Sequence, residues 1–178
     1  MLIYPAQDYS AATGFGGNTL DRMSERREDE PFLAQVRGDP RRRAILLVGE
    51  RVLLDGASAL HSRETAERLG VRFEEAVFLG SDAEGPIFAA AIEAPAEAED
   101  ISGPNTRPGS NQGAASKPRE GLTLCALRPL AVDGILSEAV LGAVGQARGV
   151  LGWHARHQFC ANCGAPTVMA QAGMRRDC

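Results

Sequence analysis

Three cysteines near the carboxyl end of the chain place the strictest limit on what it can fold into. Cys160 and Cys163 enclose a two-residue spacer, and Cys178 follows after fourteen further residues. A two-residue spacer lets both thiolates face one tetrahedral Zn²⁺ ion, and Gly164 allows the positive φ angle that such a knuckle often needs. A four-cysteine zinc ribbon carries its second Cys-x-x-Cys about 15–20 residues after the first. The spacing therefore predicts three of four zinc ligands, and we expect the fourth cysteine three residues beyond Cys178.

Alternatives to this metal site stay open from the residues alone. His157, Asp177 or solvent could fill the fourth position, or the tail could stay metal-free. The pair Cys160 and Cys163 could also be a redox pair or two free thiols, because Cys-x-x-Cys on its own is also a redox motif. The third cysteine at the correct spacing favours zinc.

Cys125 and the two histidines near the cysteine cluster indicate structural roles. Cys125 lies in the apolar run 122–130, where a small buried hydrophobic residue is expected. His154 and His157 are three residues apart near the end of a predicted helix, where a positive charge interacts favourably with the helix dipole. We therefore assign no catalytic residue among them.

Charge argues against an extended nucleic-acid surface, and hydropathy argues against a membrane span. The 178 residues carry 19 basic and 23 acidic side chains, a net charge of −4. An extended nucleic-acid surface needs a concentrated basic patch, so this mildly acidic balance argues against one. The most apolar stretch, 139–153, contains Gln146 and Arg148 and falls short of the roughly 18 apolar residues of a membrane span. Residues 1–10 lack the pattern of a secretory signal, so we expect no membrane partner and a cytoplasmic location with reduced cysteines.

Hydrophobic patterning predicts an α+β fold with a small, mostly antiparallel sheet and short helices. The Gly49–Glu50 step suits a tight hairpin, Ser62 can cap a short helix, and Gly70 can end it. After Ser137, apolar residues recur at helical spacing, which predicts a long helix to about His157 that leads into the truncated zinc ribbon. The expected strands are 43–49, 51–55, 76–80 and 86–94, and the expected short helix is 63–69.

Composition divides the chain into four parts. Residues 1–40 are polar and charged and predict an irregular arm with one short helix. The segment 95–120 has four prolines, three glycines and one aliphatic residue, Ile101, so we expect a flexible insertion or linker. The expected parts are an amino-terminal domain (1–94), the linker (95–120), the remainder of that domain with its long helix (121–158) and the partial zinc ribbon (159–178).

Four motifs spread over most of the chain outside the linker carry a resemblance to a known family. They are Phe15–Arg22 (FGGNTLDR), the strand pair around Gly49, Val77–Gly80 (VFLG) and Trp153–Gly164 (WHARHQFCANCG). The chain resembles the amino-terminal half of the NADH pyrophosphatases. These are Nudix hydrolases with a Nudix-like domain, a four-cysteine zinc ribbon and a catalytic Nudix domain. The resemblance implies a rudimentary Nudix-like fold here and the absence of the catalytic part.

The resemblance also implies the chemistry of a parent enzyme. Such an enzyme hydrolyses NAD(H) to nicotinamide mononucleotide and AMP, uses Mg²⁺ or Mn²⁺ held by glutamates, forms a homodimer, and in some members removes NAD caps from RNA. Clustered carboxylates position the divalent ions that offset phosphoryl charge. No motif in this chain identifies a substrate-contacting residue, so cofactor-binding residues stay unassigned.

A degenerate Nudix box can be laid on this chain from Gly49 onward. Thr65 stands at an aliphatic position of the box, and Arg68 replaces a metal-binding glutamate with a cation that would repel the metal. Glu64 and Arg68 are also spaced to form an ordinary exposed helix pair. We therefore interpret the box as a decayed copy without activity. The matching positions are Gly49, Asp55, Arg63, Glu64, Glu67, Gly70 and Val71.

Two hypotheses follow. The first makes the chain the non-catalytic amino-terminal and zinc-ribbon portion of an NAD(H) pyrophosphatase-like hydrolase, inactive alone, with Cys160, Cys163 and Cys178 as ligands of a structural zinc. The alternative is a standalone zinc-ribbon module that binds nucleic acid or a protein partner. The basic residues around the knuckle motivate the alternative: Arg156, His157, Arg175 and Arg176.

Overall fold

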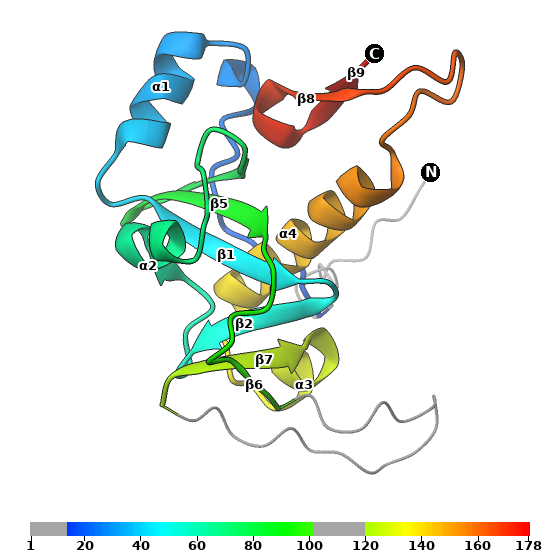
Figure 1. Ribbon diagram of the computed structural model, residues 1–178. Helices are drawn as coiled ribbons and strands as arrows, with labels where there is room; N and C mark the ends of the chain where they lie inside the picture. Colours follow the sequence, from blue (N-terminus) through cyan, green and yellow to red (C-terminus); the bar gives the residue numbers. More distant parts are fainter. Residues whose placement is uncertain (1–13, 102–119) are drawn as a thin grey trace, which may run out of the picture.

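The computed structural model describes residues 14–101 and 120–178, so residues 1–13 and most of the expected linker lie outside the described part. Figure 1 shows a sheet with helices around it, a long helix and a small carboxy-terminal hairpin. In chain order the elements are η2 (Ser24–Arg26), α1 (Glu30–Gly38), β1 (Arg43–Val48), β2 (Arg51–Asp55), β3 (His61–Ser62), α2 (Arg63–Arg68), β4 (Val77–Asp82), β5 (Gly85–Ala91), β6 (Glu99–Asp100), β7 (Leu122–Ala126), α3 (Leu127–Val132), α4 (Glu138–Arg156), β8 (Val168–Ala170), η3 (Gln171–Gly173) and β9 (Arg175–Asp177).

The main sheet runs in the order β4-β5-β1-β2-β7-β6, and β3 pairs with β1. Strand β1 is antiparallel to β2 and β3, β2 is antiparallel to β7, and β4 is antiparallel to β5. The pairs β1–β5 and β6–β7 are parallel. The predicted α+β fold with a mostly antiparallel sheet is therefore confirmed.

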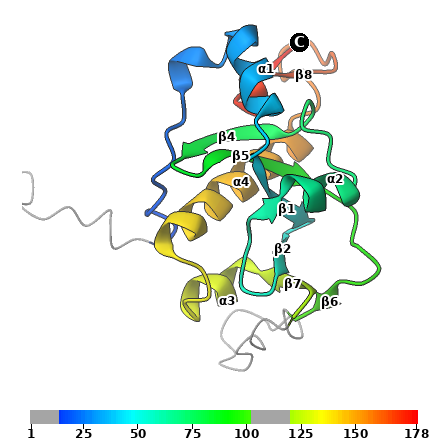
Figure 2. The same cartoon turned by 90° about the vertical axis from the view of Figure 1, so that its left-hand side faces the viewer.

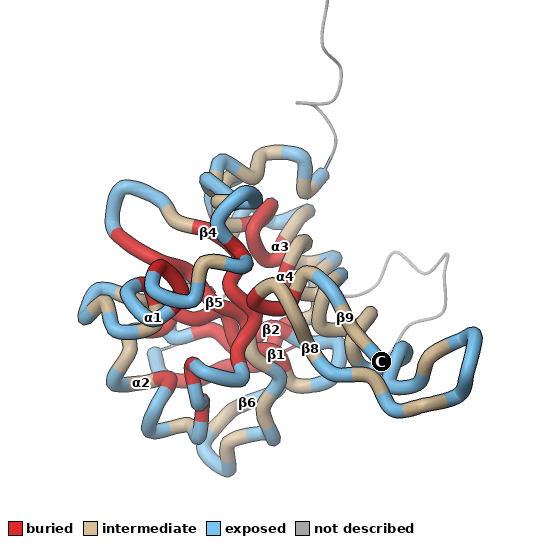
Figure 3. The backbone as a smooth tube through the Cα atoms, turned by 90° about the horizontal axis from the view of Figure 1, so that it is seen from above, coloured by how far each residue is buried: buried red, intermediate tan, exposed pale blue. Residues whose placement is uncertain are grey.

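Both faces of the sheet are covered, which explains why the central strand is a continuous apolar run. Ile45 and Leu47 of β1 face the cluster that includes the buried side of α4 and Leu130 of α3. Ala44 and Leu46 face the opposite cluster, with α1 and α2. Figure 2 shows α4 and α2 on either side of β1, and Figure 3 shows buried segments converging on the sheet.

Local sequence signals correctly predicted the turns and helix starts. Gly49 has φ +59° in the β1–β2 turn, as a tight hairpin requires. The Ser62 side chain accepts from the Thr65 amide at 3.2 Å and caps α2. The Ser137 side chain accepts from the Val140 amide at 3.4 Å and caps α4. Each cap satisfies an amide that the first helical turn would otherwise leave unpaired.

The amino-terminal arm joins the sheet edge instead of standing apart from it. Asp21 and Ser81 exchange backbone hydrogen bonds of 3.0 and 2.9 Å. A Cβ atom on Gly80 would lie 2.5 Å from the Asp21 carbonyl oxygen, so only glycine permits this approach. The one short helix expected in the arm is α1, whose Asp29 side chain accepts from the Phe32 amide at 3.0 Å.

The described start of the expected linker is ordered. Glu99–Asp100 forms β6 beside β7, and the Ile101 amide donates to the Leu124 carbonyl at 2.9 Å. Ile101 is only 5% exposed and belongs to the main core. A composition average over 95–120 hides this single apolar anchor, and residues 102–119 lie outside the described part.

Helix α4 connects the core to the carboxy-terminal hairpin. Leu141, Val144 and Ala147 are buried against the sheet, and Gln146 accepts from Asn18 at 2.6 Å and donates to the Leu79 carbonyl at 3.3 Å. Within residues 14–101 and 120–178, no helix combines the length and the apolar character needed to cross a bilayer.

The carboxy-terminal hairpin docks on the sheet through its turn. Strands β8 and β9 pair antiparallel, with Met169 opposite Arg176. Ala172 in the turn is 8% exposed, and a Cβ atom on Gly173 would lie 2.8 Å from the Val77 side chain of β4. Gly173 also has φ +97°, so glycine meets both the conformational and the spatial demand.

Candidate metal centre

The segment from 159 to 166 folds into a tight knuckle around the first two cysteines. The Cys160 amide donates to the Ala165 carbonyl at 2.8 Å, and the Gly164 amide donates to the Cys160 carbonyl at 2.9 Å. Gly164 has φ +72°, as expected from its place after the cysteine pair. Phe159 and Pro166 form a β-bridge that closes the loop. Local hydrogen bonds therefore present Cys160 and Cys163 on one side of the knuckle.

The hairpin brings the third cysteine to the same place. The sulfur atoms of Cys160, Cys163 and Cys178 all lie within 4.8 Å of one another, and none is in a disulfide. Four thiolates around one Zn²⁺ ion, at about 2.3 Å each, stand about 3.8 Å apart. Three soft, gathered sulfur donors therefore fit zinc in both chemistry and spacing. Cys163 and Cys178 are exposed, so an ion can reach the site from solvent.

The electrostatics of the cluster favour one thiolate in particular. Hydrogen bonds from the backbone amides of Cys163 and Asn162, and then contacts with the thiols of Cys163 and Cys178, lower the pKa of Cys160 to about 7. The pKa of Cys178 is raised, chiefly by its contact with the Cys160 sulfur. The knuckle amides thus stabilise negative charge on Cys160, the form that binds a metal.

The two protein side chains considered as a fourth ligand have other partners. Nδ1 of His157 lies 2.9 Å from the Trp153 carbonyl oxygen. The Asp177 carboxylate accepts from Arg175 at 2.7 and 2.9 Å. Across the described residues, the group of potential ligand atoms that converges on one point consists of the three cysteine sulfurs.

Cys125 has the buried role expected from its apolar surroundings. It is fully buried in β7, within the core cluster on the α4 side of the sheet. Burial, with smaller effects from Asp133 and Asp100, raises the pKa of its thiol to about 11. A thiol that resists ionisation is neither a nucleophile nor a metal ligand, and Cys125 is therefore a core residue.

Two carboxylates of the degenerate Nudix box, Glu64 and Glu67, are paired with arginines. Glu67 binds Arg42 at 2.8 Å, and Glu64 binds Arg63 at 3.1 Å. Arg68 binds Glu97 at 3.3 Å, so the ordinary helix pair expected between Glu64 and Arg68 is replaced by two other exposed pairs. Each such exposed pair contributes about 0–1 kcal/mol to the stability of the fold. In this structure the pairs place an arginine beside each of the carboxylates Glu64 and Glu67.

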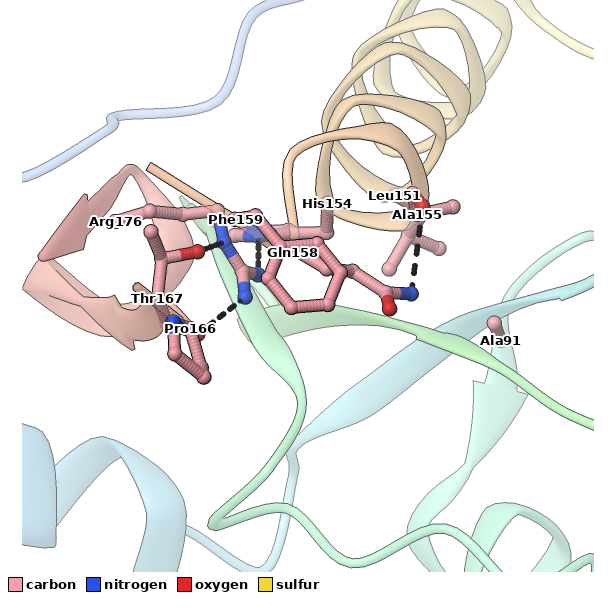
Figure 4. A pocket seen from close by; sticks show the side chains of 9 residues that line it. All are labelled: Ala91, Leu151, His154, Ala155, Gln158, Phe159, Pro166, Thr167 and Arg176. Carbon is pink, nitrogen blue, oxygen red and sulfur yellow. Dashed lines mark hydrogen bonds between the residues drawn. The ribbon is translucent and has the colours of Figure 1, made fainter. Parts of the chain in front are cut away.

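A groove lies between the end of α4 and the ribbon (Figure 4). It has a volume of about 580 Å³, and the ring of Phe159, which is 65% exposed, stands at its wall. The guanidinium of Arg176 reaches across to the ring of His154 and to Thr167. The residues that line it are Ala91, Leu151, His154, Ala155, Gln158, Phe159, Pro166, Thr167 and Arg176.

His154 does not act as the positive charge that its position near the helix end suggested. Burial first, and then the charge of Arg176, lower its pKa, although a hydrogen bond to the Gly173 carbonyl opposes them. The ring is therefore neutral at pH 7. The sequence contained no signal for this, because Gly173 and Arg176 lie 19 and 22 residues away.

Comparison with known proteins gives matches along most of the chain. Residues 41–153 match the NADH pyrophosphatase-like rudimentary NUDIX domain, and residues 155–178 match the NADH pyrophosphatase zinc ribbon domain. The NAD-capped RNA hydrolase NUDT12 of Homo sapiens and that of Macaca fascicularis are each 46% identical to this chain over 43 residues. The same hydrolase of Pongo abelii is 44% identical over 43 residues.

The relatives align with a short part of the molecule only. The aligned segment covers 24% of this chain and 9% of each relative. The rudimentary NUDIX model, by contrast, spans strands β1 to β7, all of α3 and most of α4. It joins directly to the ribbon model that contains the three clustered cysteines. The chain therefore belongs to the NADH pyrophosphatase family of Nudix hydrolases, with a rudimentary NUDIX domain followed by a zinc ribbon.

Proposed function

We propose that Cys160, Cys163 and Cys178 bind a structural zinc ion that orders the carboxy-terminal ribbon. The convergence of three sulfurs within 4.8 Å carries this proposal. Bound zinc would hold the knuckle and the end of β9 together as a cross-link between the two halves of the ribbon. The low pKa of Cys160, about 7, supports binding near neutral pH.

We propose further that this chain is the non-catalytic amino-terminal and zinc-ribbon portion of an NAD(H) pyrophosphatase-like hydrolase. The pairing of Glu64 and Glu67 with arginines supports inactivity, because a divalent ion would have to displace Arg63 and Arg42 and then face Arg68. The boundaries proposed for its parts are 1–94, 95–120, 121–158 and 159–178.

The reaction of the whole hydrolase follows from the family. It would split NAD(H) into nicotinamide mononucleotide and AMP with Mg²⁺ or Mn²⁺ in a catalytic domain outside this chain. The similarity to NAD-capped RNA hydrolases supports NAD-capped RNA as a further substrate. We also propose that the hydrolase is a homodimer, as the family resemblance implies. A cytoplasmic location fits the zinc site, because zinc binds reduced thiols and the cytoplasm keeps thiols reduced.

Two measurements on the 178-residue chain test this function. Elemental analysis after purification should give about one zinc per chain, as expected for a single tetrahedral site. Incubation with NADH and Mn²⁺, followed by chromatography, should release no more nicotinamide mononucleotide than Mn²⁺ alone. Robust release of the mononucleotide would refute inactivity, and a zinc-free protein with Cys160 bonded to Cys163 would refute the metal site.

The groove beside the ribbon favours a second candidate, a zinc-ribbon binding module. The observation that favours it is that the exposed Phe159 and Arg176 line the same groove, since aromatic and basic groups together suit nucleic acid. The charge available is modest, because Arg175 is paired with Asp177 and Glu28. Salt-sensitive binding of uncapped single-stranded RNA would support this candidate, and no binding at low salt would refute it for RNA.

A further inference from the structure

One side chain of β9 links the ribbon to the end of helix α4. Arg176 donates from Nε to the Thr167 hydroxyl at 2.7 Å and from one terminal nitrogen to the Thr167 carbonyl at 2.7 Å. Its other terminal nitrogen donates to Nδ1 of His154 at 2.8 Å. Figure 4 shows these three bonds fanning out from one guanidinium. Arg176 is two residues before Cys178, so its hydrogen bonds anchor β9 close to the last sulfur of the cluster.

His154 can accept the Arg176 bond in one protonation form only. Nε2 of the ring lies 2.8 Å from the Gly173 carbonyl oxygen, which can only accept. The guanidinium can only donate, so Nδ1 must carry a lone pair while Nε2 carries the hydrogen. The neighbouring groups are the Arg176 cation on β9, the Gly173 carbonyl in η3 and the Trp153 ring, 4.8 Å from the imidazole. Among the described residues, no carboxylate forms an ion pair with His154 or Arg176.

Thr167 extends the same network into the knuckle. Its hydroxyl donates to the His157 carbonyl at 2.8 Å, and its amide donates to the Gln158 carbonyl at 2.9 Å. The chain segment that leads into Cys160 is therefore tied to the residue that Arg176 grips. Helix end, knuckle and β9 meet in one continuous set of hydrogen bonds.

We propose that His154 and Arg176 are positioning residues for the metal centre, which together hold Cys178 in register with the Cys160–Cys163 knuckle. This inference rests on the zinc site proposed above. A metal site that is partly assembled before the ion arrives has less chain to order on binding, and its affinity rises accordingly. Partners behind the ligands commonly account for about 10–100-fold in metal affinity.

The first test compares two adjacent arginines of the same strand. Arg176→Lys keeps the charge but loses the fork that spans Thr167 and His154. Arg175→Lys is the matched control, because Arg175 pairs with Glu28 and Asp177. It takes no part in the hydrogen bonds of Arg176 to His154 and Thr167, which we call the clamp. Zinc affinity, measured by competition with a chromophoric chelator, should fall about 10-fold or more in Arg176→Lys and less than about 2-fold in Arg175→Lys. Equal affinities in the two variants would overturn the proposal, and an unchanged far-ultraviolet circular dichroism spectrum checks that both variants fold.

The second test observes the clamp without relying on metal affinity. A long-range ¹H–¹⁵N spectrum of the imidazole nitrogens should show His154 with its hydrogen on Nε2 at pH 7, and Arg176→Lys should shift the ring toward a mixture of the two tautomers. A wild-type His154 already averaged between tautomers would disprove the clamp. If the chain binds no zinc, the metal-site proposal fails, whereas this spectrum still decides whether the His154–Arg176 contact exists.

Discussion

Strand β1 and strand β9 lie in the same chain but in opposite environments. The four residues Ala44–Leu47 of β1 are buried, whereas β8 and β9 contain no buried residue. Apolar burial on both faces can stabilise the sheet by itself, at about 25 cal/mol for each Å² removed from water. Strands β8 and β9 bury little such area, so we expect the ribbon to depend on polar contacts and on the proposed zinc cross-link. We therefore expect different perturbations to unfold the sheet domain and the ribbon.

Loss of one zinc ligand should produce the largest effect, confined to the ribbon. Cys160→Ser removes the thiolate that the knuckle amides favour, and we expect zinc content to fall from about one ion per chain to near zero. Amide hydrogen exchange should then speed up in 158–178 but not in β1. The Cys125→Ala variant should retain its zinc, because that thiol is buried in the sheet domain. Faster exchange throughout the sheet would contradict the independence of the two parts.

A cavity in the core should destabilise the sheet domain and leave the ribbon largely unaffected. Phe78 is fully buried, with ring centroids 6.2 Å from Phe32 and 5.3 Å from Phe88. Phe78→Ala should cost about 3–5 kcal/mol in the free energy of unfolding, measured by urea denaturation. The exposed ring of Phe159 offers the matched control, and Phe159→Ala should change stability by less than about 0.5 kcal/mol. Similar losses in both variants would show that the ribbon shares the core's packing.

Acid should weaken the sheet domain through a buried histidine. His61 is 2% exposed, its Nε2 lies 3.0 Å from the Leu53 carbonyl oxygen, and its Nδ1 has no hydrogen-bond partner. Burial lowers its pKa below the usual 6.5, against the opposing effects of Leu53 and Asp55. The unfolded chain therefore binds the proton more readily, so the stability present above pH 6.5 falls as the pH drops toward the folded-state pKa.

Urea unfolding of the wild type and of His61→Asn at pH 7.5 and 5.5 measures this effect. The difference in unfolding free energy between the two pH values should be smaller in His61→Asn. An equal or larger difference in the variant would assign the acid sensitivity to other groups, such as His154 at the ribbon junction, whose pKa is also lowered by burial.

The smallest effect is expected at the degenerate Nudix box. Arg68→Glu restores a carboxylate at that position of the box and removes an exposed pair with Glu97, 3.3 Å long. Stability should change by less than about 1 kcal/mol. We expect no Mn²⁺-dependent hydrolysis of NADH, because Arg42 and Arg63 still neutralise Glu67 and Glu64. New hydrolysis of NADH in this variant would show that Arg68 alone keeps the degenerate box inactive.

Short-range signals predicted much of the sheet domain. The β1–β2 hairpin at Gly49, the Ser62 cap and the start of α4 after Ser137 each depend on residues a few positions apart. Propensity and capping act over that range, so the pattern of the sequence was sufficient. The ordered strand β6 was missed, because its anchor Ile101 is a single apolar residue in a segment rich in proline and glycine.

Other features depend on residues that only the folded chain brings together. Arg27 is 4% exposed, and its guanidinium donates to the Phe78 carbonyl at 2.7 Å and the Arg22 carbonyl at 2.6 Å. An arginine in a run of mixed charges carries no sign of such burial. The network of Glu28 with Gln171 and Arg175 likewise joins the start of the chain to the ribbon.

By itself, the sequence determined the residue types of the candidate centre and predicted its local geometry, since a two-residue spacer, Gly164 and a third cysteine at ribbon spacing together favour a zinc knuckle. The spacing of Cys178 also predicted its place beside that knuckle, where the structure puts it. Tertiary structure alone decided that the ring of His154 accepts a hydrogen bond from Arg176. The physical reason is distance along the chain. Turns and caps are set by neighbouring residues, whereas the contact of Arg176 with His154 spans 22 positions and exists only in the folded chain.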